Sequence, residues 1–339
     1  MKIIDFSKDG HHEIYQKNIL KIEETELLVI EKNFSLRKNG FKYFKEIKDV
    51  LDMTKNEDVH YLTLDFIFKY PLLNKLIKSR IVIGTLHKEP DTGLKKFLLK
   101  NFSKKISKII VHSEFMKTEL EKIGIYNVEV IEYPTFYNYS NLNRDNLRKE
   151  EGINNKIVIS SLGGTRLDKG IDILLEAFKY IDKNIKNNIV LNIAGKEEYF
   201  KKETIRKIAE KNEINLREKY GFLVEEEFIK NVLLTDIMIM PYRKVFSGNS
   251  GPMTEAIVNK IPCITPKGLN IGDLTEEHNL GLTFECENPK ELAKTIENMI
   301  LNKEKKDFFS SNYHKELTVE KFLRNYKEIY IKLEKGEYK

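Results

Sequence analysis

The chain alternates short apolar runs with amphipathic stretches over most of its length, and this alternation limits the folds open to it. The apolar runs are rich in Ile and Val and mostly continuous, without a polar residue at every second position. Strands of this kind are covered on both faces, as in parallel sheets whose connections are helices. We therefore predict an α/β protein with parallel sheets.

The first half contains six predicted strands with helices between them. The strands are KIIDF, ELLVI, VHYLTLDF, RIVIGTL, KIIVHS and VEVIEY, and the helices include HEIYQKNILKIEE, GLKKFLLKNFSKK and EFMKTELEKIG. The second half repeats the alternation, with KIVISSLGG, IVLNIAG, DIMIMPY and IPCITP as predicted strands. Its helix GIDILLEAFKYI has one apolar face, formed by Ile171, Leu174, Leu175 and Phe178.

The two halves are predicted to be separate domains. With 339 residues, the chain is long enough for two domains of ordinary size. Residues 141–154 are polar and lack apolar periodicity, which indicates a linker between a domain over 1–140 and a second over 155–315. Two such domains create a cleft, and open parallel sheets bind ligands beyond the carboxyl ends of their strands.

Composition excludes several classes of protein. The amino terminus, MKIIDFSKDG, has no apolar signal core, and no stretch approaches the eighteen or so apolar residues of a membrane-spanning helix. Cys263 and Cys286 sit among apolar neighbours, which fits a structural role in a reducing cytoplasm. No Asp-x-Asp pair and no His/Cys cluster with ligand spacing occurs, so no metal site is predicted.

Positive charge is concentrated in one segment. Residues 69–108 contain eleven Lys and Arg against two acids, a larger excess than the net charge of +6 of the whole chain. Within it, GLKKFLLKNFSKKISK places lysines beside apolar residues, a pattern that can lie on an anionic membrane. A core-facing helix with a solvated rim is the other interpretation, and no nucleic-acid motif accompanies the charge.

The stretch SSLGGTRLDKGIDILL is the first candidate site. An apolar strand ends at Gly163 and Gly164, where bare backbone can approach a ligand closely. Arg166 offers a planar fork for phosphate oxygens, and Lys169 adds a point charge before the next helix. The pair suits a diphosphate, although a surface turn with solvated cations has the same pattern.

The stretch VFSGNSGPMTEAI is the second candidate. Ser250 and Gly251 are small residues before a predicted helix whose first position suits Pro252. A helix start has unpaired N–H groups and a positive dipole end, and therefore binds anions. Glu255 is predicted in the first turn, where it either accepts hydrogen bonds from the vicinal hydroxyls of a ribose or simply complements the dipole.

Together these stretches resemble the carboxyl half of the family-4 retaining glycosyltransferases, which have the two-domain GT-B fold. The family pattern G-x-x-R-x-x-K-G is met by GTRLDKG with its preceding glycine, and the E-A and G-x-P-V-I elements are met by Glu255-Ala256 and IPCI. The likeness covers roughly 155–335 and is weaker in the first half. One position departs from it, because the first Glu of E-x(7)-E is replaced by Ser247.

The resemblance implies a role for each matching residue. Arg166 and Lys169 would bind the donor pyrophosphate and stabilise charge on the leaving nucleoside diphosphate, without a metal or other cofactor. Glu255 would bind the ribose, and Gly163, Gly164, Ser250 and Gly251 would line the donor site. The final amphipathic helix, within 316–339, would pack back on the first domain.

In the first half the resemblance is confined to two loops. Gly10 follows the first predicted strand, where the family has a glycine-rich loop close to the donor phosphates and the acceptor. His87 follows a strand, in the place of a family histidine that contacts the transferring sugar or the acceptor. An incidental loop histidine is the other interpretation of His87.

The sequence thus predicts a cytoplasmic, retaining, metal-independent glycosyltransferase with Rossmann-like domains whose sheets face a cleft. It would transfer a sugar from a nucleoside-diphosphate sugar to a saccharide acceptor, carried on a lipid, in surface polysaccharide or glycan biosynthesis. Residues 69–108 would hold it peripherally on the inner face of the membrane. Two alternatives stay open: a non-catalytic subunit, suggested by Ser247, and a nucleotide-sugar epimerase of the same fold.

Overall fold

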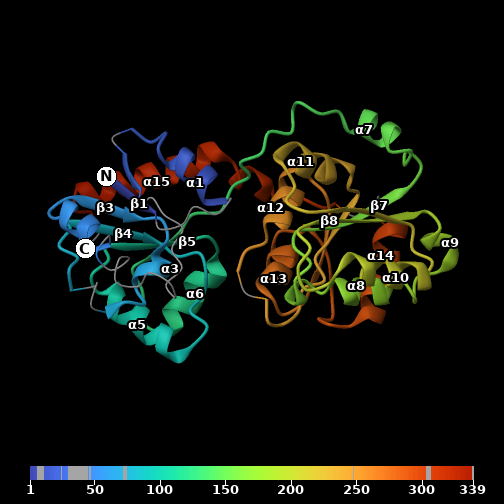
Figure 1. Ribbon diagram of the computed structural model, residues 1–339, viewed down its shortest axis with the longest axis horizontal. Coiled ribbons are helices and arrows are strands. Elements are labelled where there is room, and N and C mark those ends of the chain that lie inside the picture. Colours follow the sequence, from blue (N-terminus) through green and yellow to red (C-terminus); the bar gives the residue numbers. More distant parts are fainter. Residues whose placement is uncertain are drawn as a thin grey trace. The chain divides into compact units, whose positions relative to one another are not determined.

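A computed structural model of the chain describes residues 1–5, 11–23, 25–29, 45, 47–71, 75–246, 248–302 and 307–337. It divides into two compact units (Figure 1). Unit 1 comprises Met1–Pro134 and Thr318–Lys339, and unit 2 comprises Thr135–Leu317. The chain therefore leaves unit 1, builds unit 2 without interruption, and returns.

Unit 1 is built on a six-stranded parallel sheet. Its strands, in the spatial order β2-β1-β3-β4-β5-β6, are β1 (Lys2–Asp5), β2 (Glu26–Val29), β3 (Asp58–Tyr61), β4 (Ile81–Thr85), β5 (Lys108–Val111) and β6 (Val128–Val130). Every neighbouring pair is parallel. All six coincide with predicted strands. The order reverses between β1 and β3, and such a switch point is where open α/β sheets leave room for ligands.

Helices cover both faces of this sheet (Figure 1). One face carries α1 (His11–Ile19) and α15 (Val319–Glu334), and the other carries α3 (Leu64–Ile67), α5 (Gly93–Ser103) and α6 (Glu114–Lys122). The strand predicted over VHYLTLDF is shorter than expected, because β3 ends at Tyr61. The last three residues of the predicted stretch, LDF, belong to α3 instead. The core between the sheet and α5 includes Leu99 and Phe102, both nearly fully buried.

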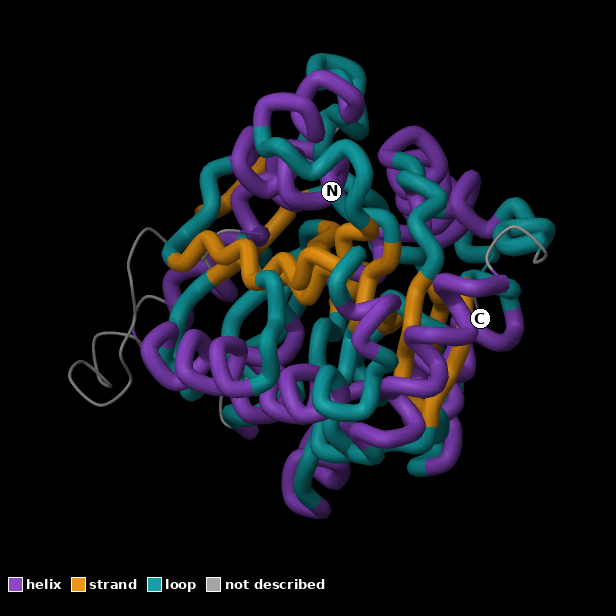
Figure 2. Tube along the Cα trace, turned by 90° about the vertical axis from the view of Figure 1, so that its right-hand side faces the viewer, coloured by secondary structure: helices purple, strands orange, loops and turns teal. Residues whose placement is uncertain are grey.

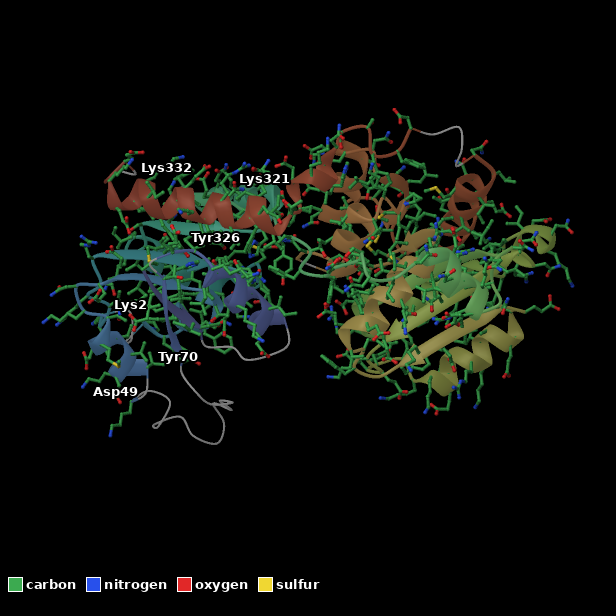
Figure 3. All side chains as sticks on the ribbon, turned by 90° about the horizontal axis from the view of Figure 1, so that it is seen from above. Lys2, Asp49, Tyr70, Lys321, Tyr326 and Lys332 are labelled. Carbon is green, nitrogen blue, oxygen red and sulfur yellow. The ribbon has the colours of Figure 1, made fainter. Side chains whose placement is uncertain are left out.

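Helix α15 joins the sheet through a buried network of histidines and tyrosines. Figure 3 shows Tyr326 on the side of α15 that faces the strands, with Lys321 and Lys332 on the opposite side. The Nδ1 atom of His60 lies 2.7 Å from the Tyr330 hydroxyl, and its Nε2 lies 2.8 Å from Thr85 Oγ1. Because strand β3 carries His60, these bonds tie the end of the chain to the middle of the sheet.

Unit 2 has a second parallel sheet, in the order β12-β11-β10-β7-β8-β9. Its strands are β7 (Ile157–Leu162), β8 (Ile189–Gly195), β9 (Leu216–Tyr220), β10 (Ile237–Ile239), β11 (Cys263–Pro266) and β12 (Gly281–Phe284). Counted within the unit, this is the Rossmann order 3-2-1-4-5-6 read backwards, with its switch point between β7 and β10. The edge strands β9 and β12 were not predicted.

Helices again enclose the strands, as Figure 2 shows in a view from the side. One face carries α8 (Ile171–Ala177), α9 (Lys183–Lys186), α10 (Lys202–Lys211) and α14 (Pro289–Asn302). The other carries α7 (Arg144–Glu150), α11 (Glu225–Leu234), α12 (Gly251–Val258) and α13 (Asn270–Glu277). The predicted apolar face of the first of these helices is buried: Ile171, Leu174, Leu175 and Phe178 all lie in the core.

The stretch predicted as a linker, 141–154, is part of unit 2. It contains α7, whose N-cap Asn143 accepts a hydrogen bond from the Asn146 N–H. The buried Arg148 is held by hydrogen bonds, since its guanidinium donates to the carbonyl oxygens of Leu234 and Lys156. A helix held this way has no apolar periodicity, so the sequence pattern did not reveal it.

None of the helices among the described residues is long and apolar enough to cross a membrane.

We expect unit 1 to be acid-labile because of His60 and His112. Burial lowers the pKa of each to about 3, so the unfolded chain binds more protons once the pH falls below the ordinary histidine value of about 6.5. Stability is then lost from pH 6.5 downward, at up to about 1.4 kcal/mol per pH unit for each histidine. Hydrogen exchange of β1 and β5 amides, corrected for intrinsic rates, measures this.

The variant His60→Gln isolates one of the two histidines. It should lose less stability between pH 6.5 and pH 5 than the wild type, although it starts from a lower value at pH 7 because the bonds to Tyr330 and Thr85 are weakened. Amides of β8 in unit 2 provide the internal comparison. An equal loss in the variant and the wild type would contradict the assignment.

Candidate functional site

The candidate site of unit 2 lies at the switch point of its sheet. Strands β7 and β10 are neighbours, with Ile237 paired to Ile159 and Met238 to Ser160. Because both strands run in the same direction, the loops that follow them leave the same edge of the sheet. The first stretch singled out in the sequence forms the loop 163–170, and the second lies after β10 and continues into α12. A ligand bound there would meet both.

Close backbone packing shapes the loop 163–170. Gly170 has φ +62°, and a Cβ at this position would lie 1.9 Å from the carbonyl oxygen of Pro241. Gly163 has φ +112°, and its Cβ would lie 3.9 Å from the Pro252 ring. The loop after β7 thus lies directly against the segment after β10. Only glycine permits this approach at residue 170.

Gly164 lies against the carboxylate of Glu198, in the loop after β8. A Cβ on Gly164 would come within 2.0 Å of Glu198 Oε2, which follows β8. The buried Thr165 fixes this neighbour, because its hydroxyl accepts a hydrogen bond from the Glu198 N–H at 2.8 Å. Thr165 also donates its own N–H to the carbonyl of Lys196. A negative charge therefore stands beside the glycine pair.

Arg166 already has an anionic partner. Its guanidinium makes a two-point contact with Asp168, with Nε 2.9 Å from Oδ1 and Nη2 2.7 Å from Oδ2. The Arg166 hydrogen bond is the main reason that the pKa of Asp168 lies below its usual range. The Arg166 side chain is half exposed, so a phosphate can reach it. To bind a phosphate with its fork, Arg166 has to share or leave Asp168.

Lys169 is different, because it is buried. The residue is 9% exposed, and its Nζ lies over the rings of Tyr242 at 3.7 Å and Phe246 at 4.2 Å from the centroids. Burial lowers the pKa of Lys169 to about 7, with Arg166 acting in the same direction and Asp168 and Glu198 opposing. An ammonium placed like this binds an incoming anion strongly, because little water competes.

Helix α12 begins as predicted after Ser250, but its details differ. Pro252 is its second residue, and Ser250 does not cap it with its side chain. The Ser250 hydroxyl instead lies 2.9 Å from the Tyr242 hydroxyl, in the interior. A Cβ added at Gly251 would meet nothing within 4 Å, and Gly251 is exposed, so the first residue of the helix is uncovered. Ser247 lies outside the described residues.

Glu255 was predicted in the first turn of this helix, and that position was wrong. It is the fifth residue of α12 and is 5% exposed. Its Oε2 accepts hydrogen bonds from the hydroxyls of Thr135 at 2.6 Å and Tyr139 at 2.8 Å. Burial raises the pKa of the Glu255 carboxyl to about 7, and these two hydroxyls oppose the rise. The carboxylate thus holds two hydroxyls, but they come from the segment that opens unit 2.

Arg243 was not predicted, yet it braces the loop 163–170. Its Nε donates to the carbonyl of Leu167 at 3.0 Å, and its N–H donates to that of Asp168 at 2.9 Å. Its Nη2 reaches Asp172 Oδ2 at 2.5 Å, at the start of α8. One arginine from the β10 side therefore fixes both the loop and the helix that follows it.

In unit 1, His87 stands after β4 at the carboxyl edge of the sheet. Its Nε2 donates to the Leu62 carbonyl at 2.7 Å, and its backbone N–H donates to Asp65 at 3.0 Å. Its ring lies 5.2 Å from that of His112, which follows β5. Gly10 lies outside the described residues. His87 is therefore held in a polar corner of unit 1 by two hydrogen bonds and a neighbouring histidine ring.

Several residues that shape the site escaped the sequence analysis. They are the partners of the predicted residues: Thr135, Tyr139, Glu198, Tyr242, Arg243 and Phe246. Some signal existed, because Tyr242 lies just before the second stretch and Phe246 within it, in the motif PYRKVF. The sequence alone, however, does not reveal that Lys169, some seventy positions earlier, lies on those rings.

The described residues contain no group of three or more His, Cys, Asp or Glu side chains placed to hold a metal ion. What unit 2 offers chemically is two cations and an uncovered helix start at one edge of the sheet. Such an arrangement binds anions.

The fold and the site place the chain in a known class. Two Rossmann-like units, the first completed by the last helix of the chain, define the GT-B fold of glycosyltransferases. The sequence profile of the family described as Glycosyl transferases group 1 matches residues 143–316, just over half of the chain. The chain belongs to this family and is a glycosyltransferase, which favours the transferase interpretation over the epimerase.

Individual proteins resemble the chain along almost its whole length. A protein of Methanocaldococcus jannaschii, described as an uncharacterized glycosyltransferase, is 23% identical, and the match covers 98% of this chain and 91% of that protein. Anabaena HepE, solved with UDP, has a TM-score of 0.76 at 15% identity and covers 97% of this chain and 98% of its own. A glycosyltransferase of Rickettsia africae has a TM-score of 0.72 at 18% identity, covering 97% of each chain.

A pair of glycine variants tests the packing of the loop 163–170. Gly170 and Gly152 have similar φ values, +62° and +67°, but a Cβ at Gly152 meets nothing within 4 Å. Gly152→Ala should cost about 1 kcal/mol, the price of the left-handed backbone alone. Gly170→Ala should cost several times more because of Pro241, as measured by urea unfolding. Equal losses would show that the close approach does not constrain the loop.

Proposed function

We propose that the chain is a retaining glycosyltransferase of family 4 that uses a nucleoside-diphosphate sugar as donor. The observation that carries the proposal is the placement of Arg166, Lys169 and the uncovered start of α12 at one switch point. Two cations and a helix start match the charge of a pyrophosphate. In this proposal, unit 2 is the donor-binding domain and unit 1 is the acceptor-side domain.

Arg166 and Lys169 stabilise the negative charge that develops on the leaving diphosphate. This electrostatic stabilisation takes the place that a divalent cation has in other transferases, so the reaction is proposed to be metal-independent and to need no cofactor. Gly163 and Gly164 let the backbone approach the phosphates, with Ser250 and Gly251 across from them at the start of α12.

Glu255 is proposed to bind the ribose. Both hydrogen bonds that the structure describes to its carboxylate end on Oε2, so Oε1 is the atom proposed to bind a ribose hydroxyl. That the carboxylate already accepts from two hydroxyls supports its suitability for a diol. The solved complexes of HepE with UDP and with UDP-glucose make UDP the first nucleotide to test.

The acceptor is proposed to be a saccharide on a lipid carrier, and the reaction a step in building a surface polysaccharide or another glycan. His87, at the carboxyl edge of the unit 1 sheet, is proposed to contact the transferring sugar or the acceptor. Gly10, in the loop after β1, is proposed to lie near the donor phosphates.

A lipid-linked acceptor fits the surface of α5. Leu94 and Phe97 are 68% and 61% exposed, beside Lys95, Lys96 and Lys100. The helix is also anchored inward by Leu99 and Phe102, so the two interpretations of this segment describe its two faces. We propose that the outer face lies on an anionic membrane, which would hold the enzyme peripherally on the cytoplasmic side.

Nucleotide binding tests the donor site. UDP, GDP, ADP and CMP are each added in thermal unfolding, where a ligand at about a hundred times its Kd contributes about 2.7 kcal/mol and raises Tm by several degrees. One nucleotide should act in this way. Arg166→Ala and Lys169→Ala should each weaken its binding at least tenfold, since each loses a charge-assisted contact.

The matched control is Lys179→Ala, which removes an exposed lysine of the same unit that pairs with Glu176. It should bind the nucleotide like the wild type. Normal affinity in both site variants would sink the donor-site assignment. Retention is checked separately, by NMR of the anomeric configuration in the product.

Vesicle flotation tests the membrane face. The wild type should float with anionic vesicles at low salt, and Leu94→Glu and Phe97→Glu should each lower the bound fraction severalfold, because each places a negative charge on the apolar side. Tyr126→Glu is the control, since Tyr126 is 74% exposed in unit 1 but lies outside residues 69–108. An equal effect of all three changes would rule out a specific face.

A further inference from the structure

Lys169 is held by two aromatic rings instead of a carboxylate. Its Nζ lies 3.7 Å from the ring centroid of Tyr242 and 4.2 Å from that of Phe246. These two rings, called here the ring seat, have centroids 4.4 Å apart and planes tilted by 50°. They therefore form a corner of two π-faces, and such faces attract a cation.

The ring seat is fixed by the structure around it. Tyr242 is 1% exposed, and its hydroxyl is bonded to Ser250 at the start of α12. Phe246 is held from the backbone, where its N–H donates to the carbonyl of Arg243. Gly170, directly after Lys169, packs on the carbonyl of Pro241, directly before Tyr242. The lysine and its rings are thus brought together by two adjacent strands.

The charged groups that the structure describes around Lys169 do not form an ion pair with it. On its own loop, Asp168 is occupied by the two-point contact with Arg166. From the β8 side, Glu198 acts on it only through space, and from the β10 side it meets the rings, of which Tyr242 is the titratable one. Among the described residues no carboxylate forms an ion pair with this ammonium. Other lysines of the unit, such as Lys179 and Lys230, have one.

We propose that Tyr242 and Phe246 are positioning residues for the transfer reaction: they hold Lys169 where no described carboxylate pairs with it, so that a phosphate of the donor becomes its ion pair. The inference rests on the proposed function of the same loop. It concerns residues that follow β10, not the lysine alone, and it assigns to the two rings a task beyond filling the core.

Burial also links this binding to a proton. With its pKa lowered to about 7, Lys169 loses its proton far more readily near neutral pH than an exposed lysine does. A phosphate beside it favours the charged form, so binding takes up a proton from solvent. Affinity should therefore fall as the pH rises above about 7, by up to tenfold per pH unit, until the pH reaches the higher pKa that Lys169 has in the complex.

The test observes Lys169 directly, by NMR of the full chain labelled with ¹³C at the lysine Cε positions. The Lys169 signal is identified by its loss in Lys169→Arg. In the wild type it should be shifted upfield by the two rings and titrate near pH 7. Phe246→Ala removes one ring and admits water, so the signal should move downfield and its midpoint should rise by at least one pH unit.

Two further variants keep the result interpretable. Tyr242→Phe retains both rings and loses only the bond to Ser250, so the Lys169 signal should stay as in the wild type. Phe246→Leu keeps an apolar side chain without a π-face, so the upfield shift should shrink even if water stays out. A wild-type signal that titrates near 10.5, or one that Phe246→Ala and Phe246→Leu both leave unmoved, would overturn the ring seat.

Adding UDP, and then GDP, ADP and CMP in turn, separates this inference from the proposed function. The nucleotide that binds should raise the midpoint of Lys169 by at least one pH unit in the wild type. If none does while Phe246→Ala still shifts the signal, the donor assignment fails and the ring seat stands. If the Lys169 midpoint without nucleotide is the same in the wild type and in Phe246→Ala, and a nucleotide raises it in both, the ring seat fails and the donor assignment stands.

Discussion

The parallel pairing of β7 with β10 is the contact on which the candidate site depends. These strands are neighbours in the sheet but lie about 75 residues apart in the chain. Their loops are therefore brought together by the pairing of the strands and not by closeness in sequence. Their register sets Gly170 against Pro241 and Lys169 against Tyr242. A slip of this pairing would leave each strand intact and still remove the site, because every contact between the two loops would be lost.

The two cations of the loop are prepared in opposite ways. Arg166 stays charged, half exposed and paired with Asp168, so a ligand has to exchange one partner for another. Lys169 is buried on rings and loses much of its charge near neutral pH. The first residue offers a directional fork and the second a proton-dependent point charge. A site built in this way distinguishes an anion by both its shape and its charge.

Much of the fold could be predicted from the sequence, because central parallel strands have continuous apolar runs. The edge strands β9 and β12 were missed. Strand β9 carries charged residues such as Arg217 and Glu218 that mask the apolar pattern, and β12, with the sequence GLTF, is too short to form a clear run. The candidate residues were found as single positions, but their partners were not. Tyr242 beside Lys169, and Thr135 beside Glu255, are products of three-dimensional packing that spacing alone does not encode.

The route of the chain also sets the order in which the units can be completed during synthesis. Unit 2 is one uninterrupted stretch, so its core can close while the ribosome is still adding the last helix. Unit 1 starts first but finishes last, because Tyr330, the partner of His60, arrives only with α15. A nascent chain therefore carries an open, histidine-lined sheet through most of translation, and a nonsense codon before residue 319 would leave it open permanently.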